Sequence, residues 1–466
     1  MTESNLTTPD PAHDLPAPLV AWLETALAGK IIHKERSVSR REGWRVDIER
    51  TNGTRLEGFL RLERFDGDKI KRPICQVNHE TAVIEALHRR SLPVPGVLAH
   101  DEELQATLFE RLPGRDDIHE LQDLGQQSKI AREFMRRLAQ IHSLDVDELN
   151  LKTCSVPVST EDYALSGIDD LERTYRSSAP EPDPLAELTF AWLRRNIPAA
   201  PERPALLQGD TGPGNFIYQD DHLSAILDWE CAHLGDPMED LGHLFSRAFF
   251  HPWGEMSPLM EVYTQATGRP LDREKLHFYR VASFAKAALG STAAVNFFKV
   301  EGPLPMMIFY SVAGERGLAQ SIASALGVDV EDAALPSPPE GLPSPLTLPI
   351  ETISDHIIDK ELSPRLEDAY LRHRAAELRQ LAHYQARRER HLSALVEQEL
   401  KELRGLLEGP VDTLRDGLAR VNALIDAWDE ARMPDVVRYL TRRAQRAEAL
   451  ALPLAGRFSD PHLSPL

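Results

Sequence analysis

The feature that most constrains this chain is a tight loop, Leu207–Phe216, with the sequence LQGDTGPGNF. Its glycines and its proline favour sharp turns of the backbone. The loop holds a carboxylate, Asp210, and an amide five residues later, Asn215. A second carboxylate, Asp228, ends a short apolar strand and begins the sequence Asp-Trp-Glu. Any fold of this chain has to place these three polar side chains at the ends of short, buried elements.

These side chains offer one base and two hard oxygen ligands. A carboxylate can take the proton of a hydroxyl group as that group attacks phosphorus, and amide and carboxylate oxygens suit Mg²⁺. We therefore predict Asp210 as a catalytic base and Asn215 and Asp228 as metal ligands for phosphoryl transfer from Mg-ATP. The alternatives are structural: Asp210 caps a turn, Asn215 bonds to backbone, and Asp228 closes a turn at the end of its strand.

The first part of the chain predicts a small antiparallel sheet. Apolar and charged residues alternate over residues 44–49 and 56–63, and Asn52-Gly53 between them is a strong hairpin signal. Further strands are expected at residues 31–36, 97–100 and 106–110. One helix is expected at residues 78–90, with Asn78 as its N-cap. The prediction is five strands and one helix over about residues 31–112.

The rest of the chain predicts helices, interrupted by a hairpin at 216–227. Five prolines fall within residues 335–348, a composition typical of an extended linker. The predicted segments are a disordered tail (1–18), a nucleotide-binding lobe (19–112), a catalytic and acceptor-binding helical lobe (113–334), the linker (335–348) and an all-α C-terminal domain (349–466).

Composition excludes several classes of partner and compartment. The net charge is -20, and no Lys/Arg-rich run alternates with aromatic residues, so we expect no nucleic-acid partner. Three cysteines without a C-x-x-C pair argue against a disulfide framework and a structural zinc site, and favour a reducing compartment. The N-terminal region lacks the apolar core of a signal peptide, and the apolar stretch 284–298 contains Lys286. We predict a cytoplasmic protein that does not bind membranes.

The motifs in their order resemble the aminoglycoside phosphotransferase family of the protein-kinase-like fold. Members carry H-G-D-x-x-x-x-N and then D-[WF]-E; this chain has Gln208-Gly209-Asp210 with Asn215, then Asp228-Trp229-Glu230 and Gly235-Asp236-Pro237. The resemblance covers about residues 20–330. It implies an α+β, bilobal fold, with a small antiparallel β lobe carrying one helix and a larger, mainly helical lobe, followed here by a C-terminal all-α domain.

The resemblance also implies a nucleotide-binding set in the small lobe. Arg61 stands where the family has a phosphate-binding lysine, and Glu80 on the following helix is its natural partner. Ser39 lies in a loop, 37–43, that would cover the phosphates although it has one glycine. Glu110 and Leu112 flank the hinge that would hold adenine. The alternatives are that Arg61 and Glu80 are surface charges and that the loop is an ordinary polar turn.

Three classes of function follow, and the first is a small-molecule kinase that uses ATP and Mg²⁺ on a hydroxylated acceptor. The residues of these motifs look most like those of the kinase-like domain of certain acyl-CoA dehydrogenases. That resemblance implies a hydroxyacyl-CoA or a hydroxy acid as the acceptor; an aminoglycoside- or choline-type acceptor is the alternative. The second class is a pseudokinase or ATP-binding module, favoured by Gln208 in place of histidine, by Arg61 and by the glycine-poor loop. The third, a protein kinase, is disfavoured because Asp228 is followed too soon by Gly235-Asp236-Pro237 for an activation segment.

The C-terminal helices look similar to a small uncharacterised helical domain. They show no metal or nucleophile pattern, so we expect them to dock or stabilise. A homodimer through these helices is a further hypothesis.

Overall fold

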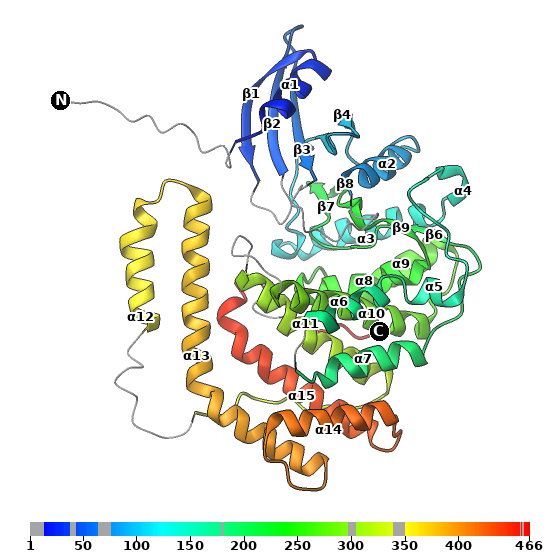
Figure 1. The fold of residues 1–466 in the computed structure, drawn as a ribbon. Coiled ribbons are helices and arrows are strands. Elements are labelled where there is room, and N and C mark those ends of the chain that lie inside the picture. Colours follow the sequence, from blue (N-terminus) through cyan, green and yellow to red (C-terminus); the bar gives the residue numbers. More distant parts are fainter. Residues whose placement is uncertain are drawn as a thin grey trace, which may run out of the picture. The chain divides into compact units, whose positions relative to one another are not determined.

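The computed structural model describes residues 14–37, 43–63, 76–178, 181–296, 304–338, 350–456, 458 and 461–466. Helices and an antiparallel sheet are both present, so the predicted α+β class is confirmed (Figure 1). The chain divides into two compact units. The first unit takes residues 1–156, 205–210 and 214–234, and the second takes 157–204, 211–213 and 235–466.

The first unit contains the sheet and the loop with the candidate site residues. In chain order its elements are α1 (Ala17–Ala26), β1 (Gly29–Arg36), β2 (Gly43–Arg50), β3 (Arg55–Leu62), α2 (Val77–His88), β4 (Val97–Asp101), β5 (Ala106–Glu110), η2 (Ile118–Glu120), α3 (Leu124–His142), α4 (Val146–Leu149), β6 (Ala205–Leu207), β7 (Phe216–Gln219), β8 (His222–Ile226) and η3 (Trp229–Cys231), and β9 (His233–Gly235) follows at the boundary.

The five predicted strands form one antiparallel sheet in the order β1-β2-β3-β5-β4. Asn52-Gly53 makes the turn between β2 and β3, and Gly53 has φ +81°, which glycine adopts without strain. The helix prediction was right but its N-cap was wrong. Helix α2 begins at Val77 after Gln76, and the Asn78 side chain donates to the carbonyl of Glu102 instead.

Alternation along β3 decides which side chains meet which helix. Successive residues of a strand point to opposite faces. Leu60 and Leu62 therefore pack in a core with Leu19 and Leu23 of α1, while Arg61 points to the other face and reaches Glu80 on α2. Burial of the apolar face fixes the register, since a one-residue slip would bury Arg61 in the apolar core.

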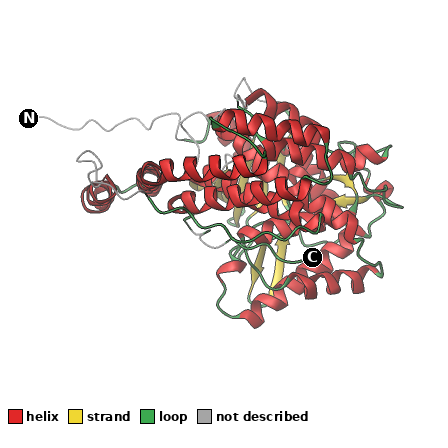
Figure 2. Ribbon diagram, turned by 90° about the horizontal axis from the view of Figure 1, so that it is seen from below, coloured by secondary structure: helices red, strands yellow, loops and turns green. Residues whose placement is uncertain are grey.

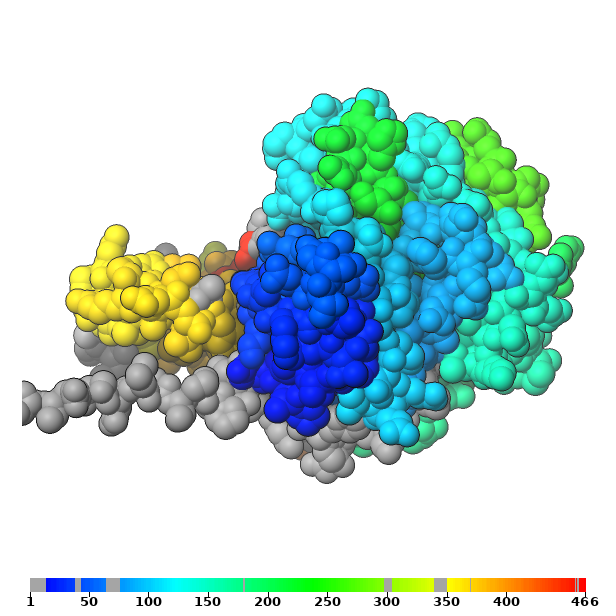
Figure 3. Space-filling model, turned by 90° about the horizontal axis from the view of Figure 1, so that it is seen from above, coloured from blue at the N-terminus to red at the C-terminus, as the bar shows by residue number. Residues whose placement is uncertain are grey.

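The β7–β8 hairpin rests on helix α3. Lys129 of α3 is 2.6 Å from Asp221 in the hairpin turn, and Glu133 accepts the backbone N–H of Leu223 at 3.1 Å. Figure 3 shows the hairpin in green beside cyan segments that precede it in the chain. These contacts hold the hairpin that lies between the loop of residues 207–216 and Asp228.

The second unit consists mainly of helices, and Figure 2 shows how far helix outweighs strand in the molecule. Its elements are α5 (Thr160–Ala164), α6 (Ile168–Ser178), α7 (Pro184–Arg195), α8 (Pro237–Phe250), α9 (Met256–Thr267), α10 (Arg273–Asn296), α11 (Leu304–Ala325), α12 (Ile350–Asp355), η4 (His356–Leu362), η5 (Ser363–Arg365), α13 (Ala369–Leu406), α14 (Leu414–Ala427), α15 (Met433–Ala451) and η6 (Leu452–Leu454).

Helices beyond residue 349 share a compact unit with α8, α10 and α11. Helix α15 packs on α11, where Arg316 forms an ion pair with Glu448. Within the C-terminal helices, Arg446 is 2.7 Å from Glu402 of α13. The predicted domain boundaries stay a prediction. Residues 1–13 of the predicted tail and 339–348 of the predicted linker lie outside the described residues.

One partly buried carboxyl in this unit makes stability depend on pH. Burial, and then the charge of Asp183, raise the pKa of Glu315 to about 8, against the opposing charge of Arg443. An unfolded glutamate titrates at about 4.3. The folded protein therefore binds this proton more tightly than the unfolded chain, and stability falls as pH rises between those two values.

We expect Glu315→Gln to remove this fall. Melting temperatures of the wild type and the variant should diverge steadily in the variant's favour as pH rises from about 5 to about 8, and stay parallel above that. Other titrating groups are common to both proteins and cancel in the difference. A difference that does not change with pH would show that Glu315 titrates normally.

Two further observations concern membrane crossing and the cysteines. Throughout the described ranges, no helix combines the length and the apolar character that crossing a bilayer requires. Cys154 and Cys231 are free thiols, and Cys75 lies outside the described residues.

Candidate active site

Arg61 lies at the centre of a cluster of carboxylates in the first unit. Its Nε is 3.2 Å from Glu80 Oε2, and its Nη2 is 3.3 Å from Glu230 Oε2 and also pairs with Asp228 Oδ1. The Arg61 side chain is 17% exposed and that of Glu80 is 3% exposed. The ion pair predicted between Arg61 and Glu80 is present, and the alternative of two surface charges is wrong.

The carboxylates around Arg61 keep its guanidinium charged. Burial alone would lower the pKa of Arg61, but the charges of Glu80, Asp228 and Glu230 raise it well above its ordinary value. The guanidinium therefore stays charged at any usable pH. The carboxylates of Glu80, Asp228 and Glu230 thus all pair with this one guanidinium.

Asp210 and Asn215 are joined directly across the loop. The Nδ2 group of Asn215 donates to the backbone carbonyl of Asp210 at 2.6 Å and to its carboxylate Oδ2 at 2.8 Å. The amide hydrogens thus orient Asp210, and the amide oxygen is the atom with which Asn215 can hold a cation. Asp210 is partly exposed and Asn215 is buried. This geometry fits a base that has to reach a substrate.

Gln208 braces the loop against Leu227, which lies between the end of β8 and Asp228. Its Nε2 donates to the carbonyl of Leu227 at 2.6 Å, and the N–H of Leu227 donates to the carbonyl of Asn215 at 2.8 Å. Both backbone groups of the residue before Asp228 are therefore fixed to the loop. Glutamine thus makes a bracing contact at the position where the family's motif has histidine.

Gly209 in the loop and Asp228 after the hairpin both have a positive φ angle. Gly209 has φ +81°, and a Cβ there would collide with the carbonyl of Cys231, so only glycine fits. Asp228 has φ 61° and ψ 59°, a left-handed conformation that aspartate adopts more readily than most residues with a side chain. Its carboxylate pairs with Arg61.

His79, one residue before Glu80, was not predicted from the sequence. Its ring is buried, with Nε2 2.8 Å from the carbonyl of Ala232 and Nδ1 2.8 Å from Thr153 Oγ1. A carbonyl only accepts, so Nε2 carries the proton and Nδ1 accepts from the threonine. Burial lowers the pKa of His79 despite the bond to Ala232, which keeps the ring neutral. His79 ties α2 to the segment that follows Asp228 and Glu230.

The remaining predicted nucleotide contacts are less defined. Ser39 lies outside the described residues. The N–H groups of Glu110 and Arg111 donate to the carbonyls of Gly96 and Glu57, so neither is available to adenine. Among the described residues, the N–H of Leu112 donates to no backbone carbonyl.

Asp236 of the Gly-Asp-Pro motif is the N-cap of α8, where it accepts from Met238 N and pairs with Lys275 at 2.6 Å.

The residues present fit a magnesium ion. Asn215 and Asp228 supply an amide and a carboxylate oxygen, the hard ligands that Mg²⁺ takes from proteins when phosphates complete its shell. Asp228 is 31% exposed, so a cation can reach it. Within the described residues, no group of three or more His, Cys, Asp or Glu side chains could hold a metal ion by itself, so phosphate oxygens would have to complete the shell.

The sequence match decides the family. Residues 54–279 match the model of a family described as "Phosphotransferase enzyme family", and this stretch contains the Arg61 cluster, the loop and Asp228. Residues 54–279 form a phosphotransferase family domain. The family predicted from the motifs and the predicted enzyme class, a phosphotransferase, are both confirmed.

Curated relatives of this phosphotransferase domain are larger proteins. The chain is 25% identical over 224 residues to acyl-CoA dehydrogenase family member 11 of Rattus norvegicus, covering 44% of the chain and 27% of that protein. It is 25% identical over 243 residues to the Homo sapiens protein of the same name, covering 49% and 30%. The chain thus spans less than a third of the length of these relatives. Among solved structures, choline kinase LicA from Streptococcus pneumoniae is 17% identical with TM-score 0.47, covering 66% of this chain and 98% of that one.

Sequence reasoning missed His79 and left Glu230 aside. Glu230 had a signal, because it is the third residue of the Asp-Trp-Glu motif. His79 had none, since its partners Thr153 and Ala232 are distant along the chain.

Proposed function

We propose that this protein transfers the γ-phosphoryl group of ATP to a hydroxyl group of a small molecule. The observation that carries the proposal is the geometry of the first unit. There the Arg61–Glu80 pair meets Asp228, while Asn215 of the same loop orients Asp210. Phosphoryl transfer requires groups that bind the phosphates of the donor, ligands for a cation, and a base. Its catalysis depends mainly on positioning and electrostatic stabilisation.

In the proposed reaction Asp210 accepts the proton of the acceptor hydroxyl as its oxygen attacks the γ-phosphorus. The bond between that phosphorus and the bridging oxygen breaks, and ADP leaves. Asn215 keeps the Asp210 carboxylate in place through the bond at 2.8 Å. Arg61 binds donor phosphate oxygens, and Glu80 and Glu230 hold its guanidinium. Bound Mg²⁺ would neutralise phosphate charge, and Asn215 and Asp228 would hold it.

For the acceptor, we propose a hydroxyacyl-CoA or a related hydroxy acid. The support is similarity to proteins named as acyl-CoA dehydrogenase family members, a name that points to acyl-CoA compounds. An aminoglycoside- or choline-type acceptor is the alternative. Adenine would bind at the hinge, with Leu112 N–H as donor. We propose a cytoplasmic location on the composition alone.

A second candidate, an ATP-binding module without turnover, is favoured by one contact. Arg61 pairs directly with Asp228, so it competes for a carboxylate that would hold the metal. In this candidate, Asp228 still contributes to the binding of Mg-ATP, but its contact with Arg61 keeps it from the position that transfer requires.

A nucleotide-binding measurement tests the site shared by both candidates. We expect Mg-ATP to raise the melting temperature by several degrees, and Asp228→Asn to reduce this shift at least fivefold because a metal ligand is lost. Asp221→Asn in the exposed hairpin turn is the matched control and should keep the wild-type shift. An unchanged shift in Asp228→Asn would remove Asp228 from the nucleotide site.

We also propose that the protein is a homodimer through its C-terminal helices. Leu371, Leu378 and Leu392 of α13 are 49%, 60% and 47% exposed, and their seven-residue spacings put them on one face. Helix α12 lies beside α13 (Figure 1), and its Ile350 and Ile353 are also exposed. The charged residues of the two helices pair within one chain, as Arg379 does with Asp359 at 2.6 Å and Arg390 with Glu351 at 2.7 Å. The exposed apolar side chains therefore carry the proposal.

Light scattering on the full chain tests the dimer. The wild type should have the mass of two chains, and Leu371→Glu with Leu378→Glu should give one chain with unchanged far-UV circular dichroism. Leu326→Glu, at an exposed position after α11, is the control that should stay dimeric. A monomeric wild type at about 50 μM would contradict the proposal.

A further inference from the structure

Helix α8 holds the middle of the loop of residues 207–216 through an arginine in its last turn. Arg247 donates twice to the backbone carbonyl of Pro213, from Nε at 3.2 Å and from Nη2 at 2.6 Å. Two N–H groups of one guanidinium thus meet a single oxygen, and a charged donor forms a stronger hydrogen bond than a neutral one. Pro213 lies three residues after Asp210 and two before Asn215. The contact therefore acts on the stretch of backbone that joins the predicted base to a predicted metal ligand.

The same stretch of the loop packs closely on α8. Residues 211–213 are buried and belong to the second unit together with α8. Gly212 has φ +136°, and a Cβ at this position would lie 3.0 Å from Arg247 Cβ and 3.3 Å from Leu244 Cδ2. Glycine at position 212 thus lets the backbone come close enough to the helix for the Arg247 side chain to reach Pro213. Hydrogen bonds and close packing together fix this part of the loop on α8.

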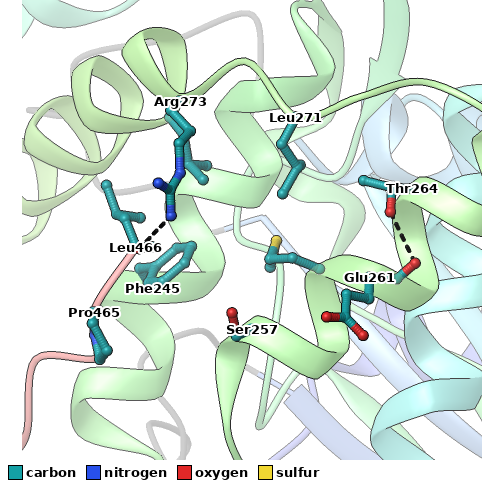
Figure 4. A pocket seen from close by; sticks show the side chains of 10 residues that line it. Phe245, Ser257, Glu261, Thr264, Leu271, Arg273, Pro465 and Leu466 are labelled. Atoms are coloured by element: carbon teal, nitrogen blue, oxygen red, sulfur yellow. Dashed lines mark hydrogen bonds between the residues drawn. The ribbon is translucent and has the colours of Figure 1, made fainter.

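Helix α8 can hold the loop because the helix is itself fixed within the second unit. Its N-cap Asp236 pairs with Lys275 of α10 at 2.6 Å. Gly242 lies so near the backbone of Tyr279 in α10 that a Cβ would come within 2.7 Å of the Tyr279 carbonyl carbon. Phe245 faces a small cavity that side chains of α9 and α10 also line (Figure 4). The Gly-Asp-Pro motif thus begins a helix that is anchored on α10 and carries Arg247 to the loop.

We propose that Arg247 is a positioning residue for the phosphoryl transfer proposed above, a role that rests on that function. Arg247 acts through the backbone: by fixing the Pro213 carbonyl it keeps one conformation between Asp210 and Asn215. The Asn215 amide then stays bonded to the Asp210 carboxylate at 2.8 Å. A displacement of about 1 Å in a catalytic group can lower a rate about 10²-fold, because the reacting atoms are no longer aligned. Loss of Arg247 should therefore affect turnover far more than nucleotide affinity.

Amide hydrogen exchange and kinetics of the full chain test this role together. Arg247→Met keeps the Cβ and Cγ atoms that pack on Gly212 but has no donor for Pro213. We expect amide exchange in the peptide 207–216 to become at least about tenfold faster, kcat to fall about 10–100-fold, and the Kd of Mg-ATP to change less than about fivefold. Arg247→Lys keeps the charge and one donor group, so it should give intermediate values. Arg173→Met, at an exposed position on α6 of the same unit, should match the wild type.

Wild-type exchange of peptide 207–216 in Arg247→Met, or a kcat within about threefold of the wild type, overturns the role of Arg247. A loss of Mg-ATP affinity as large as the loss of kcat overturns it as well, because a general loosening of the site would explain both. Exchange needs no acceptor, so a wild type that forms no ester refutes the proposed phosphoryl transfer, whereas normal loop exchange in Arg247→Met refutes the contact. If Arg247→Met does not fold, Arg247→Lys decides, and wild-type values of both exchange and kcat overturn the proposal.

Discussion

Replacing Asp210 by asparagine is expected to lower turnover about 10³-fold or more while nucleotide binding changes by less than about threefold. Asparagine keeps the size of the side chain and the bond from Asn215 to an oxygen, but it cannot accept a proton. The loop stays in place because Gln208 and Leu227 hold it independently of the carboxylate. The loss should therefore appear in kcat, with little change in the Kd of Mg-ATP.

Steady-state ADP release and isothermal titration with Mg-ATP measure the two quantities separately. Asp221→Asn controls for a change of charge at the surface of the same unit, since its partner Lys129 is exposed. A variant at Asp210 that retains more than about a tenth of the wild-type kcat would remove this residue from the chemical step.

Replacing Arg61 by methionine is expected to destabilise the protein by about 3–5 kcal/mol at neutral pH and to abolish nucleotide binding. The substitution keeps much of the apolar stem but removes the guanidinium that pairs with Glu80, Asp228 and Glu230. Removing one partner of a buried ion pair costs more folding free energy than the intact pair contributes, because the charges that remain are desolvated and have lost that partner.

The pH dependence of this variant separates lost charge from lost packing. Without Arg61, repulsion should raise the pKa of the clustered carboxyls in the folded state above their unfolded values. The folded variant then binds more protons than its unfolded chain, so its stability should rise as pH falls from about 7 toward about 5. Arg61→Lys should keep most of the stability, since the charge remains, but bind nucleotide more weakly because the bidentate geometry is lost.

Urea unfolding at several pH values measures the effect. A loss in Arg61→Met of less than about 1 kcal/mol at neutral pH would show that solvent already screens the three carboxylates.

Local signals in the sequence were enough for the sheet and for part of the site. Resemblance to the family identified Arg61 and its partner Glu80, and the strand-then-helix order supported the pair that the structure shows. The Gly/Pro loop placed Asp210 and Asn215 within reach of each other. These features depend on residues close along the chain, whose geometry follows from period and turn chemistry.

Contacts between distant segments could not be predicted in the same way. His79 reaches Ala232 across 153 positions, and nothing in its own helix distinguishes it from a surface histidine. The contact of Arg61 with Asp228 depends on how the hairpin returns to the sheet, which is set by packing on α3. The start of α2 at Val77 also depended on context, since Asn78 bonds to Glu102.

Phosphorus NMR of the full chain with Mg-ATP and a panel of acceptors tests the central claim most directly. The panel holds a 3-hydroxyacyl-CoA, a free hydroxy acid, choline and an aminoglycoside, each with wild type and Asp210→Asn. We predict a new phosphate-ester signal and matching ADP with the hydroxyacyl-CoA or the hydroxy acid, and neither product with the variant. ATP that binds in an Asp228-dependent manner but yields no ester with any acceptor would contradict the phosphotransferase account and leave an ATP-binding module.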